Sequence, residues 1–463
     1  MISVQSHRLL SNGNKHFIFN LLLVLLVFAC GTTKKSSTVK PTKRPEKPKL
    51  EDKTPKNLPE KIDTIQWKEE VPSKDDKIIV PDKDNPPTQT EKLPNTNSTD
   101  QLQLVALIPF KVDEIDTTSN KIPGQNLRFV HFYSGMKLAL DELNQVKATY
   151  VQFDIFDTEE MDVSKNILQK YESKLPHIII GPYKSDALKY AADWAKKNQT
   201  VVISPWISSS SITEKNPYYI QAKAGLNSHY QLISSHVRTH FPIENTILIS
   251  RSKEESKARI FNDTLLHLSA IHEEFISEDD LAKNADPILE KYFKAEGPTI
   301  FILPLASTRD ENYIYHFLRR VISEKKNKTV YVYGLSKWLE MKAEILEYIN
   351  VLNVRLSISN FVDADKPEVV NFRKKYFNVY REFPSDDAME GYDLTKFIVS
   401  SLRNYGEHFY TQEFKSNEKY LQTDFQLKPV YKNNNKLFSD IEYYENQYIK
   451  LIEIKNNRYK MID

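Results

Sequence analysis

The chain has 463 residues but only one cysteine, Cys30, and only 10 glycines. A single cysteine cannot form a disulfide within the chain or build a metal site made of cysteines. The glycine-rich phosphate loops GxxxxGK[ST] and GxGxxG are absent. The formal net charge is +2, whereas dedicated nucleic-acid-binding domains carry a strong basic excess. We therefore expect no disulfide, no cofactor and no nucleic-acid partner.

Enzyme signatures are absent as well. Neither HExxH nor GxSxG occurs, and the 11 histidines are scattered along the chain. Acidic pairs such as Asp279–Asp280 and Asp386–Asp387 are typical of solvated loops rather than of paired catalytic carboxylates. We expect a protein that is not an enzyme and that binds no metal.

A short apolar run stands near the amino terminus. Residues 17–28 (FIFNLLLVLLVF) follow the basic residues Arg8 and Lys15 and precede Cys30. A basic start, a short apolar core and small residues at a cleavage site are the parts of a secretory signal. The alternative, a membrane-spanning anchor, needs about 20 apolar residues, and this run is shorter. We predict a signal peptide over 1–29.

The sequence Val-Phe-Ala-Cys at 27–30 resembles the lipobox of bacterial lipoproteins. In that family the signal peptidase cleaves before the cysteine, and acyl chains such as palmitate join its thiol and the new amino group. The resemblance implies that Cys30 carries the lipid, and several acyl chains hold a protein far better than one does. No acidic retention or surface-export signal follows at 31–33. We expect a lipid-anchored protein of the outer membrane that faces the periplasm.

Residues 30–100 are rich in Lys, Pro, Thr, Ser and Asp and contain few apolar side chains. Such a segment buries too little apolar surface to offset the entropy lost on ordering. We predict a disordered linker here, which as a flexible coil would span roughly 45 Å.

From Gln101 onward, apolar runs that often end at proline or glycine alternate with helical patterns. The first series has predicted strands at 102–109, 150–156, 177–180 and 200–204, and predicted helices at 129–143, 163–175 and 186–198. The second series has predicted strands at 245–249, 272–276, 299–303 and 329–333, and predicted helices at 227–240, 256–268, 282–292 and 312–323. Helices at 367–380 and 392–405 follow, and the aromatic strands after residue 424 predict a hairpin. The alternation predicts two parallel sheets covered by helices.

This order of elements resembles that of type I periplasmic binding proteins of the branched-chain amino-acid receptor class. The matching segments are LVALIPF, FYSGMKLALDEL, IIIGPYKSDAL, TVVISPWISSS, VYVYGLSKW and the block from Phe372 to Phe397. The resemblance covers 102–463. Its later part is most similar to Bacteroidetes lipoproteins of this fold, and the penicillin-binding-protein activator lipoproteins, which are tethered to the outer membrane, also use it.

The resemblance implies an α/β fold of two Rossmann-like lobes joined by a three-segment hinge, with a ligand held between the lobes. We expect the first lobe to comprise 101–221 plus 362–422. The second lobe would comprise 222–361 plus 423–463.

In parallel α/β sheets, ligands meet the carboxyl ends of the strands. Residues 181–185 follow one such strand, and Ser185 is expected to cap the next helix, whose free amides can bind a carboxylate. Plain helix capping without a ligand is the alternative reading of this turn.

A serine-rich loop over 204–211 follows the next strand. The hydroxyls of Ser204, Ser208 and Ser209 could bind a charged or polar ligand, and Trp206 could wall its pocket. A polar loop that is merely anchored by its tryptophan is the alternative.

Further expectations come from the resemblance. In amino-acid receptors of this fold, residues matching Tyr392 and Asp393 can face the ligand, although Asp393 could instead be a helix cap or a hinge residue. Family members often have Tyr-Gly after the first strand of the second lobe, where the amine of the ligand is bound. This chain has Ser250–Glu254 there, so an amino acid is not the only ligand to consider.

Two functions follow as hypotheses. The first is a binding lipoprotein that closes its lobes around a small polar ligand, either amino-acid-like or derived from the cell wall. The second is a non-catalytic regulator of peptidoglycan synthesis that contacts a cell-wall synthase or peptidoglycan.

Lipidation of Cys30 is directly testable. The change Cys30→Ser should abolish incorporation of labelled fatty acid and release the protein from the membrane fraction, because no other cysteine can replace the lost thiol. A variant that stays membrane-bound and still incorporates label would contradict the lipobox interpretation.

Overall fold

The computed structural model describes residues 101–115, 118, 122–145, 150–158, 160–251, 260–262, 269–283, 286–411, 418–432, 440–456 and 458–462. Cys30, the predicted signal peptide and the predicted linker lie outside these ranges. Most of the helix predicted over 256–268 also lies outside them. Within the described ranges, no helix combines the length and the apolar character needed to cross a bilayer.

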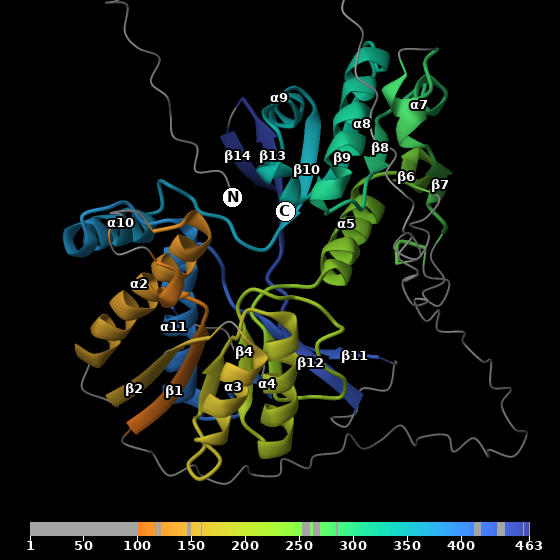
Figure 1. Ribbon diagram of the computed structural model, residues 1–463. Coiled ribbons are helices and arrows are strands. Elements are labelled where there is room, and N and C mark those ends of the chain that lie inside the picture. The colour runs from red at the N-terminus through yellow and green to blue at the C-terminus, as the bar shows by residue number, and fades with distance from the viewer. Residues whose placement is uncertain are drawn as a thin grey trace, which may run out of the picture. The chain divides into compact units, whose positions relative to one another are not determined.

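A seven-stranded sheet forms the first lobe, in the order β11-β12-β5-β4-β3-β1-β2 (Figure 1). Its strands are β1 (Gln101–Ile108), β2 (Tyr150–Asp157), β3 (Ile178–Ile180), β4 (Val201–Ser204), β5 (Tyr219–Gln221), β11 (Leu427–Tyr431) and β12 (Ile441–Asn446). All neighbouring strands pair parallel except β11 and β12, which pair antiparallel.

Helices cover both faces of this sheet. They are α2 (Gly124–Gln145), α3 (Met161–Gln169), α4 (Ser185–Asn198) and α11 (Asp386–Tyr405), with short 3-10 turns at Val112–Glu114 and Phe409–Thr411. Helix α10 (Pro367–Tyr380) packs on α2 and α11 rather than on the sheet. Successive residues of β1 point to opposite faces: Leu104 and Ala106 pack with α2 and α11, whereas Val105 and Leu107 pack with α3 and α4. Burial on both faces explains why β1 reads as a continuous apolar run.

A second seven-stranded sheet follows the order β14-β13-β10-β9-β8-β6-β7. Its strands are β6 (Thr246–Ser250), β7 (His272–Phe275), β8 (Thr299–Ile302), β9 (Val330–Leu335), β10 (Asn353–Ile358), β13 (Lys450–Lys455) and β14 (Arg458–Ile462). The strands β6 to β10 pair parallel, whereas β13 and β14 are antiparallel to their neighbours.

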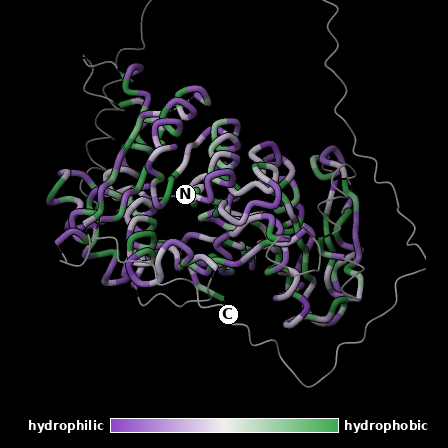
Figure 2. The backbone as a smooth tube through the Cα atoms, turned by 90° about the horizontal axis from the view of Figure 1, so that it is seen from below, coloured by the Kyte–Doolittle hydropathy of each residue, from purple (hydrophilic) through white to green (hydrophobic). Residues whose placement is uncertain are grey.

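Helices again lie on both faces of the second sheet. They are α5 (Leu226–His240), α7 (Glu278–Ala282), α8 (Glu311–Glu324) and α9 (Ala343–Val351), with 3-10 turns at Ile243–Asn245, Glu290–Tyr292, Thr308–Asp310 and Ser336–Glu340. The core beneath α8 and α9 is separate from the core beneath α5. Polar and apolar stretches alternate along the helices (Figure 2), as expected where each helix has one buried face.

The α/β fold with two lobes is confirmed, but the expected hairpin in the tail is wrong. Strand β12 joins β5 in the first sheet, and β13 joins β10 in the second. The predicted boundary at 422–423 is therefore wrong for β11 and β12, which belong to the first lobe. Both faces of β12 are buried, because Tyr443 and Tyr444 enter different cores. An aromatic strand of this kind fits a central position as well as a hairpin.

The chain passes between the sheets three times, at 222–225, 359–366 and 447–449. Hydrogen bonds tie these crossings to neighbouring segments. The backbone amide of Phe361 donates to the carbonyl of Gln422 at 2.8 Å, and the Thr423 hydroxyl donates to the carbonyl of Ser359 at 3.0 Å. The Asn446 side chain donates to the carbonyl of Ala222 at 3.3 Å. The end of β12, just before the third crossing, thus holds the first crossing.

Helices α2 and α11 approach each other through glycine. A Cβ on Gly135 would lie 1.8 Å from the carbonyl oxygen of Ala388, and one on Gly391 would lie 2.0 Å from that of Phe132. Both neighbours are backbone atoms, which cannot move aside without shifting a helix. The close packing of the two helices therefore requires glycine at both positions.

The substitution Gly135→Ala should lower the free energy of unfolding by at least about 2 kcal/mol, because overpacking a tight contact forces the backbones apart. Chemical denaturation measures the change. Gly124→Ala, at the start of the same helix, is the control, because no atom lies within 4 Å of its added Cβ. Equal stability of the two variants would contradict the close contact.

Candidate functional site

The turn after β3 is fixed against its neighbours. Gly181 has a φ of +82°, and a Cβ there would lie 2.4 Å from the carbonyl oxygen of Leu107. Its amide donates to the carbonyl of Ile203 at 2.9 Å. The turn is thus held beside β1 and β4, at the carboxyl ends of the parallel strands, where ligands bind in this class of sheet.

Ser185 is not the cap of α4, contrary to the sequence prediction. Lys184 occupies the N-cap position with no side-chain cap hydrogen bond, and Ser185 is the exposed first residue of the helix. The Nζ of Lys184 lies 2.6 Å from the Glu160 carboxylate. Lys184 thus provides no cap, but the amide of Ala187 in the first turn donates to the Asp186 carboxylate at 2.8 Å.

The serine loop after β4 uses most of its hydroxyls internally. The buried Ser204 hydroxyl donates to the carbonyl of Ile207 at 2.8 Å and accepts from its amide at 3.2 Å. The Ser209 and Ser211 hydroxyls lie 2.8 Å apart. The half-buried Ser208 hydroxyl has no hydrogen-bond partner among the described residues. Of the three predicted serines in this loop, Ser208 is therefore the one available to a ligand.

Trp206 lies in an aromatic cluster. Its ring centroid is 5.3 Å from that of Phe129, 5.0 Å from that of Phe132 and 5.9 Å from that of Tyr183. The indole Nε1 is buried and has no acceptor within the described part of the chain. A buried donor without an acceptor is uncommon in native proteins, and the Nε1 of Trp194 is a second such donor.

Arg128 adds a cation beside this cluster. Its guanidinium lies 5.3 Å from the ring centroid of Phe129 and 5.8 Å from that of Tyr183. One guanidinium nitrogen lies 3.5 Å from the Asp387 carboxylate, which is a long ion pair. The Arg128 side chain therefore keeps donors for another anion.

Lys223 is a second cation on the first lobe, in the segment that follows β5. Its Nζ lies 2.9 Å from the carboxylate of Glu390. Burial raises the pKa of Glu390, and the attraction of Lys223 opposes that rise. Sequence analysis missed both Arg128 and Lys223, because isolated basic residues carry no local signal and both acidic partners come from α11.

Tyr392 belongs to helix packing. Its hydroxyl donates to the Glu142 carboxylate at 2.7 Å, and its ring centroid lies 4.8 Å from that of Phe372. It is buried in the small core that α2, α10 and α11 share. These contacts do not bring it together with the serine loop, so only the sequence resemblance supports a ligand-binding role for Tyr392.

Asp393 holds the segment at Leu421 and Gln422, which lies at the hinge. A hinge role was the alternative that the sequence analysis gave to ligand binding for this residue. Its fully buried carboxylate accepts from the amides of Leu421 at 2.8 and 3.0 Å and of Gln422 at 2.9 Å. Burial raises the pKa of Asp393 to about 7, and the backbone amides that donate to the carboxylate oppose the rise. Asp393 thus titrates near neutral pH while it fixes the segment that contacts the second crossing.

In the second lobe, Arg251 directly follows β6. Its guanidinium lies 3.1 Å from the Asp310 carboxylate and 3.6 Å from that of Glu278. It also lies 4.6 Å from the ring centroid of Tyr313. The Arg251 guanidinium is therefore paired with carboxylates of its own lobe.

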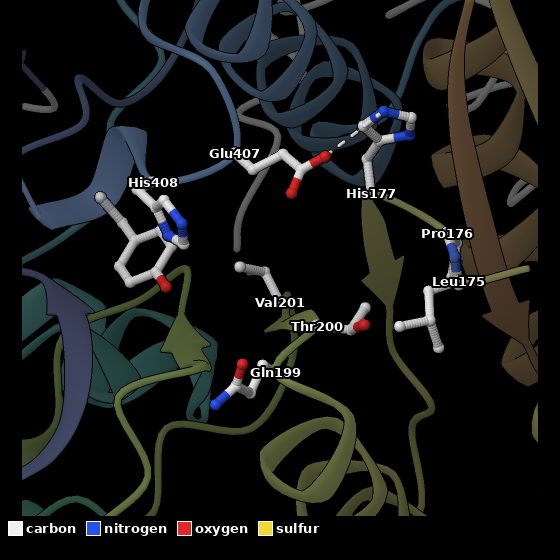
Figure 3. A pocket seen from close by; sticks show the side chains of 9 residues that line it. Leu175, Pro176, His177, Gln199, Thr200, Val201, Glu407 and His408 are labelled. Carbon is white, nitrogen blue, oxygen red and sulfur yellow. Dashed lines mark ion pairs between the residues drawn. The ribbon is translucent and has the colours of Figure 1, made fainter. Parts of the chain in front are cut away.

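A small cavity of about 90 Å³ lies at the opposite, amino-terminal ends of β3 and β4 (Figure 3). His177 accepts at Nδ1 from the backbone amide of Gln103 at 3.0 Å, and its Nε2 lies 3.7 Å from Glu407. In the described ranges, no cluster of three His, Cys, Asp or Glu side chains could hold a metal. The cavity is separate from the loops at the carboxyl ends of the strands.

Two helix-covered sheets, joined by three crossings and with polar loops at their strand ends, define a two-lobe binding protein of the type I periplasmic class. The chain belongs to the family described as receptor family ligand binding region, which matches residues 131–432. Comparison with curated proteins finds no match.

Solved structures share this fold at low sequence identity. A protein described as a branched-chain amino acid ABC transporter from Rhodospirillum rubrum is 15% identical, with a TM-score of 0.56, over 78% of this chain and 100% of that one. An ABC transporter substrate-binding protein from Desulfitobacterium hafniense is 14% identical, with a TM-score of 0.50 over the same shares. Full-length LpoA from Haemophilus influenzae is 12% identical, with a TM-score of 0.50, over 80% of this chain and 60% of that one. These identities establish the fold alone.

The titration of Asp393 gives a pH prediction. An unfolded Asp titrates near pH 4, below the folded pKa of about 7. The protonated carboxyl therefore makes its whole contribution to the free energy of unfolding below about pH 4. That contribution is lost as the pH rises through about 7. Relative to Asp393→Asn, the wild type should lose up to about 4 kcal/mol of unfolding free energy across this range.

Denaturant unfolding at several pH values measures this difference. The exposed Asp141→Asn on α2 is the control and should show no comparable dependence, because it is not buried. Parallel pH profiles of the wild type and Asp393→Asn would contradict a carboxyl that titrates near neutrality.

Proposed function

We propose that this chain is an extracytoplasmic binding lipoprotein that closes two lobes around a small polar ligand. The family assignment and the two-lobe fold support a binding role. The absence of catalytic motifs in the sequence supports binding without catalysis. The lipobox-like sequence at Cys30 supports an anchor in the outer membrane, with the folded lobes in the periplasm.

The proposed ligand contacts are on the first lobe. The observation that carries the proposal is the buried indole Nε1 of Trp206, which lacks an acceptor. Arg128 lies against two rings of the same aromatic cluster. The Ser208 hydroxyl and the amides of Ser185 and Asp186 supply further donors, whereas the amide of Ala187 already donates to the Asp186 carboxylate. Ser204 and Ser209 shape the loop through their own hydrogen bonds. These donors suit a ligand with a carboxylate, such as an amino acid or a cell-wall peptide fragment.

The hinge contacts support lobe closure as the mechanism. The crossings are short, and hydrogen bonds of the Thr423 and Asn446 side chains tie two of them to neighbouring segments. A few such residues can absorb the change in backbone angles that closure requires. A ligand that donates to one lobe and accepts from the other would then favour the closed state.

A second candidate is a regulator of peptidoglycan synthesis that contacts a synthase. An exposed aromatic pair on the first lobe favours it. Phe377 on α10 is 39% exposed and Phe383 is 76% exposed, and their ring centroids lie 5.3 Å apart. The exposed cations Lys374 and Arg381 lie nearby in sequence. Exposed aromatic side chains flanked by arginine are typical of protein contact surfaces.

A thermal-shift screen with amino acids and peptidoglycan fragments tests the first candidate, because a bound ligand raises the melting temperature by mass action. For a ligand found this way, Ser208→Ala and Trp206→Phe should each weaken binding by about 1–3 kcal/mol, the cost of a lost hydrogen bond to a charged group. Titration calorimetry measures the change.

Trp194→Phe is the matched control. The indole Nε1 of Trp194 is also buried without a partner among the described residues, but Trp194 lies near the carboxyl end of α4 and outside the aromatic cluster of Trp206. Unchanged affinity in both loop variants would move the site elsewhere. No ligand in the screen, together with direct binding of a purified cell-wall synthase, would favour the regulator.

A further inference from the structure

The outer side of α10 and the turn after it form a surface that we call the aromatic face. It comprises Val370, Lys374, Phe377, Arg381 and Phe383, of which Val370 is half-buried and the other four are exposed. The first three follow the i, i+4, i+7 spacing, so they lie on one side of the helix. This side differs from the one that enters the core shared with α2 and α11.

The two phenylalanines give this face an apolar centre. Among the described residues, Phe383 is the most exposed large apolar side chain, at 76%. Its ring packs on that of Phe377 with the centroids 5.3 Å apart, so the two rings form one continuous apolar surface. Covering them would remove apolar area from water, which favours a partner that has apolar side chains of its own.

Two cations border the rings. Within the described ranges, neither Lys374 nor Arg381 forms an ion pair with a carboxylate. The carboxylate of Glu382, which follows Arg381 in the chain, pairs instead with His131 at 3.3 Å. A partner that fits this face therefore combines apolar side chains with acidic ones.

The predicted linker contains one segment with this composition, residues 58–70 (LPEKIDTIQWKEE). Trp67 is the single aromatic residue between positions 31 and 100. The other apolar side chains of the segment are Leu58, Ile62 and Ile65, and its acidic residues, Glu60, Asp63, Glu69 and Glu70, outnumber its basic residues, Lys61 and Lys68. The segment lies outside the described ranges, so its sequence and its distance along the chain are what select it as the occupant.

The segment can reach the aromatic face. About 30 residues separate it from β1, and at about 3.3 Å per residue they extend to about 100 Å. A folded part of about 360 residues has a radius of gyration of only about 20 Å. Because the segment belongs to the same chain, its effective concentration is about millimolar, and even a weak contact is then populated.

We propose that residues 58–70 dock on the aromatic face of their own chain, with Trp67 against Phe377 and Phe383 and with acidic side chains facing Lys374 and Arg381. The docked segment covers the surface that favours the regulator as second candidate, so a synthase would have to displace it. Docking also leaves only 30–57 between the lipid anchor and the folded lobes, a coil of roughly 30 Å. The contact itself depends neither on the ligand-binding loops nor on the lipid.

Limited trypsin digestion of the full chain in a Cys30→Ser background tests the proposal, with cleavage at each site followed by mass spectrometry. Lys61 lies in the docking segment, whereas Lys92 lies outside it. Phe383→Ser should raise the rate of cleavage after Lys61 by about fivefold or more, because docking protects this site from the protease. Lys374→Glu should act in the same direction, because it repels the acidic segment. The rate after Lys92 should not change.

Val351→Ser is the matched control, because Val351 is 68% exposed but lies on α9 of the second lobe, and its digestion should equal that of the wild type. Phe383→Ser should keep the melting temperature of the wild type, since its side chain is exposed. Trp67→Ser leaves the folded lobes untouched and should release Lys61 to the same extent. Equal cleavage after Lys61 in the wild type, Phe383→Ser and Trp67→Ser would overturn the proposal. Protection of Lys61 that falls when the protein is diluted would overturn it as well, because the occupant would then be a second copy.

Discussion

The rest of this structure depends on helix α11. Its backbone lies very close to that of α2, and one of its carboxylates is buried against the hinge. Gly391 lets α11 approach α2 closely, and two residues later Asp393 holds the amides of Leu421 and Gln422. Gln422 and Thr423 in turn hold the second crossing. The first lobe and the hinge are thus positioned by a single turn of one helix.

The same helix also sets the electrostatics of the proposed loop site. Its first turns supply Asp387 and Glu390, which partly neutralise Arg128 and Lys223. A simple anion therefore competes with the protein's own carboxylates for these cations. A ligand that also offers a positive group would not face this penalty, because the acidic side chains would then contribute to binding.

The start of the second lobe shows a related arrangement. The carboxylate of Glu445 on β12 accepts from the amide of Gly225 at 3.1 Å and from the hydroxyl of Ser228. The first turn of α5, where a ligand anion could otherwise bind, is occupied by a side chain of β12, the strand that precedes the third crossing. This end of the helix supports the hinge rather than a ligand.

The sequence correctly predicted those helices and strands that are specified by the pattern of neighbouring apolar and polar residues. Apolar runs such as 102–109 gave the central strands, because a parallel strand is buried on both faces. The tail was misread, because the alternation in 441–446 specifies a strand but not its neighbour. The role of Ser185 was misread by one residue, which is within the usual error of helix ends. Arg128 and the buried Nε1 of Trp206 depend on contacts between distant segments, which no local pattern encodes.

Closure of the lobes around a ligand is the central claim, and a distance measurement between the lobes tests it most directly. In a Cys30→Ser background, spin labels at Tyr150→Cys and Val351→Cys report on the first and second lobes, because both positions are exposed at 63% and 68%. Adding a saturating mixture of amino acids and peptidoglycan fragments should shift the distance distribution measured by electron spin resonance. The account predicts a narrower distribution centred on a different distance, as expected of a closed state. A distribution that does not change with any ligand would contradict it.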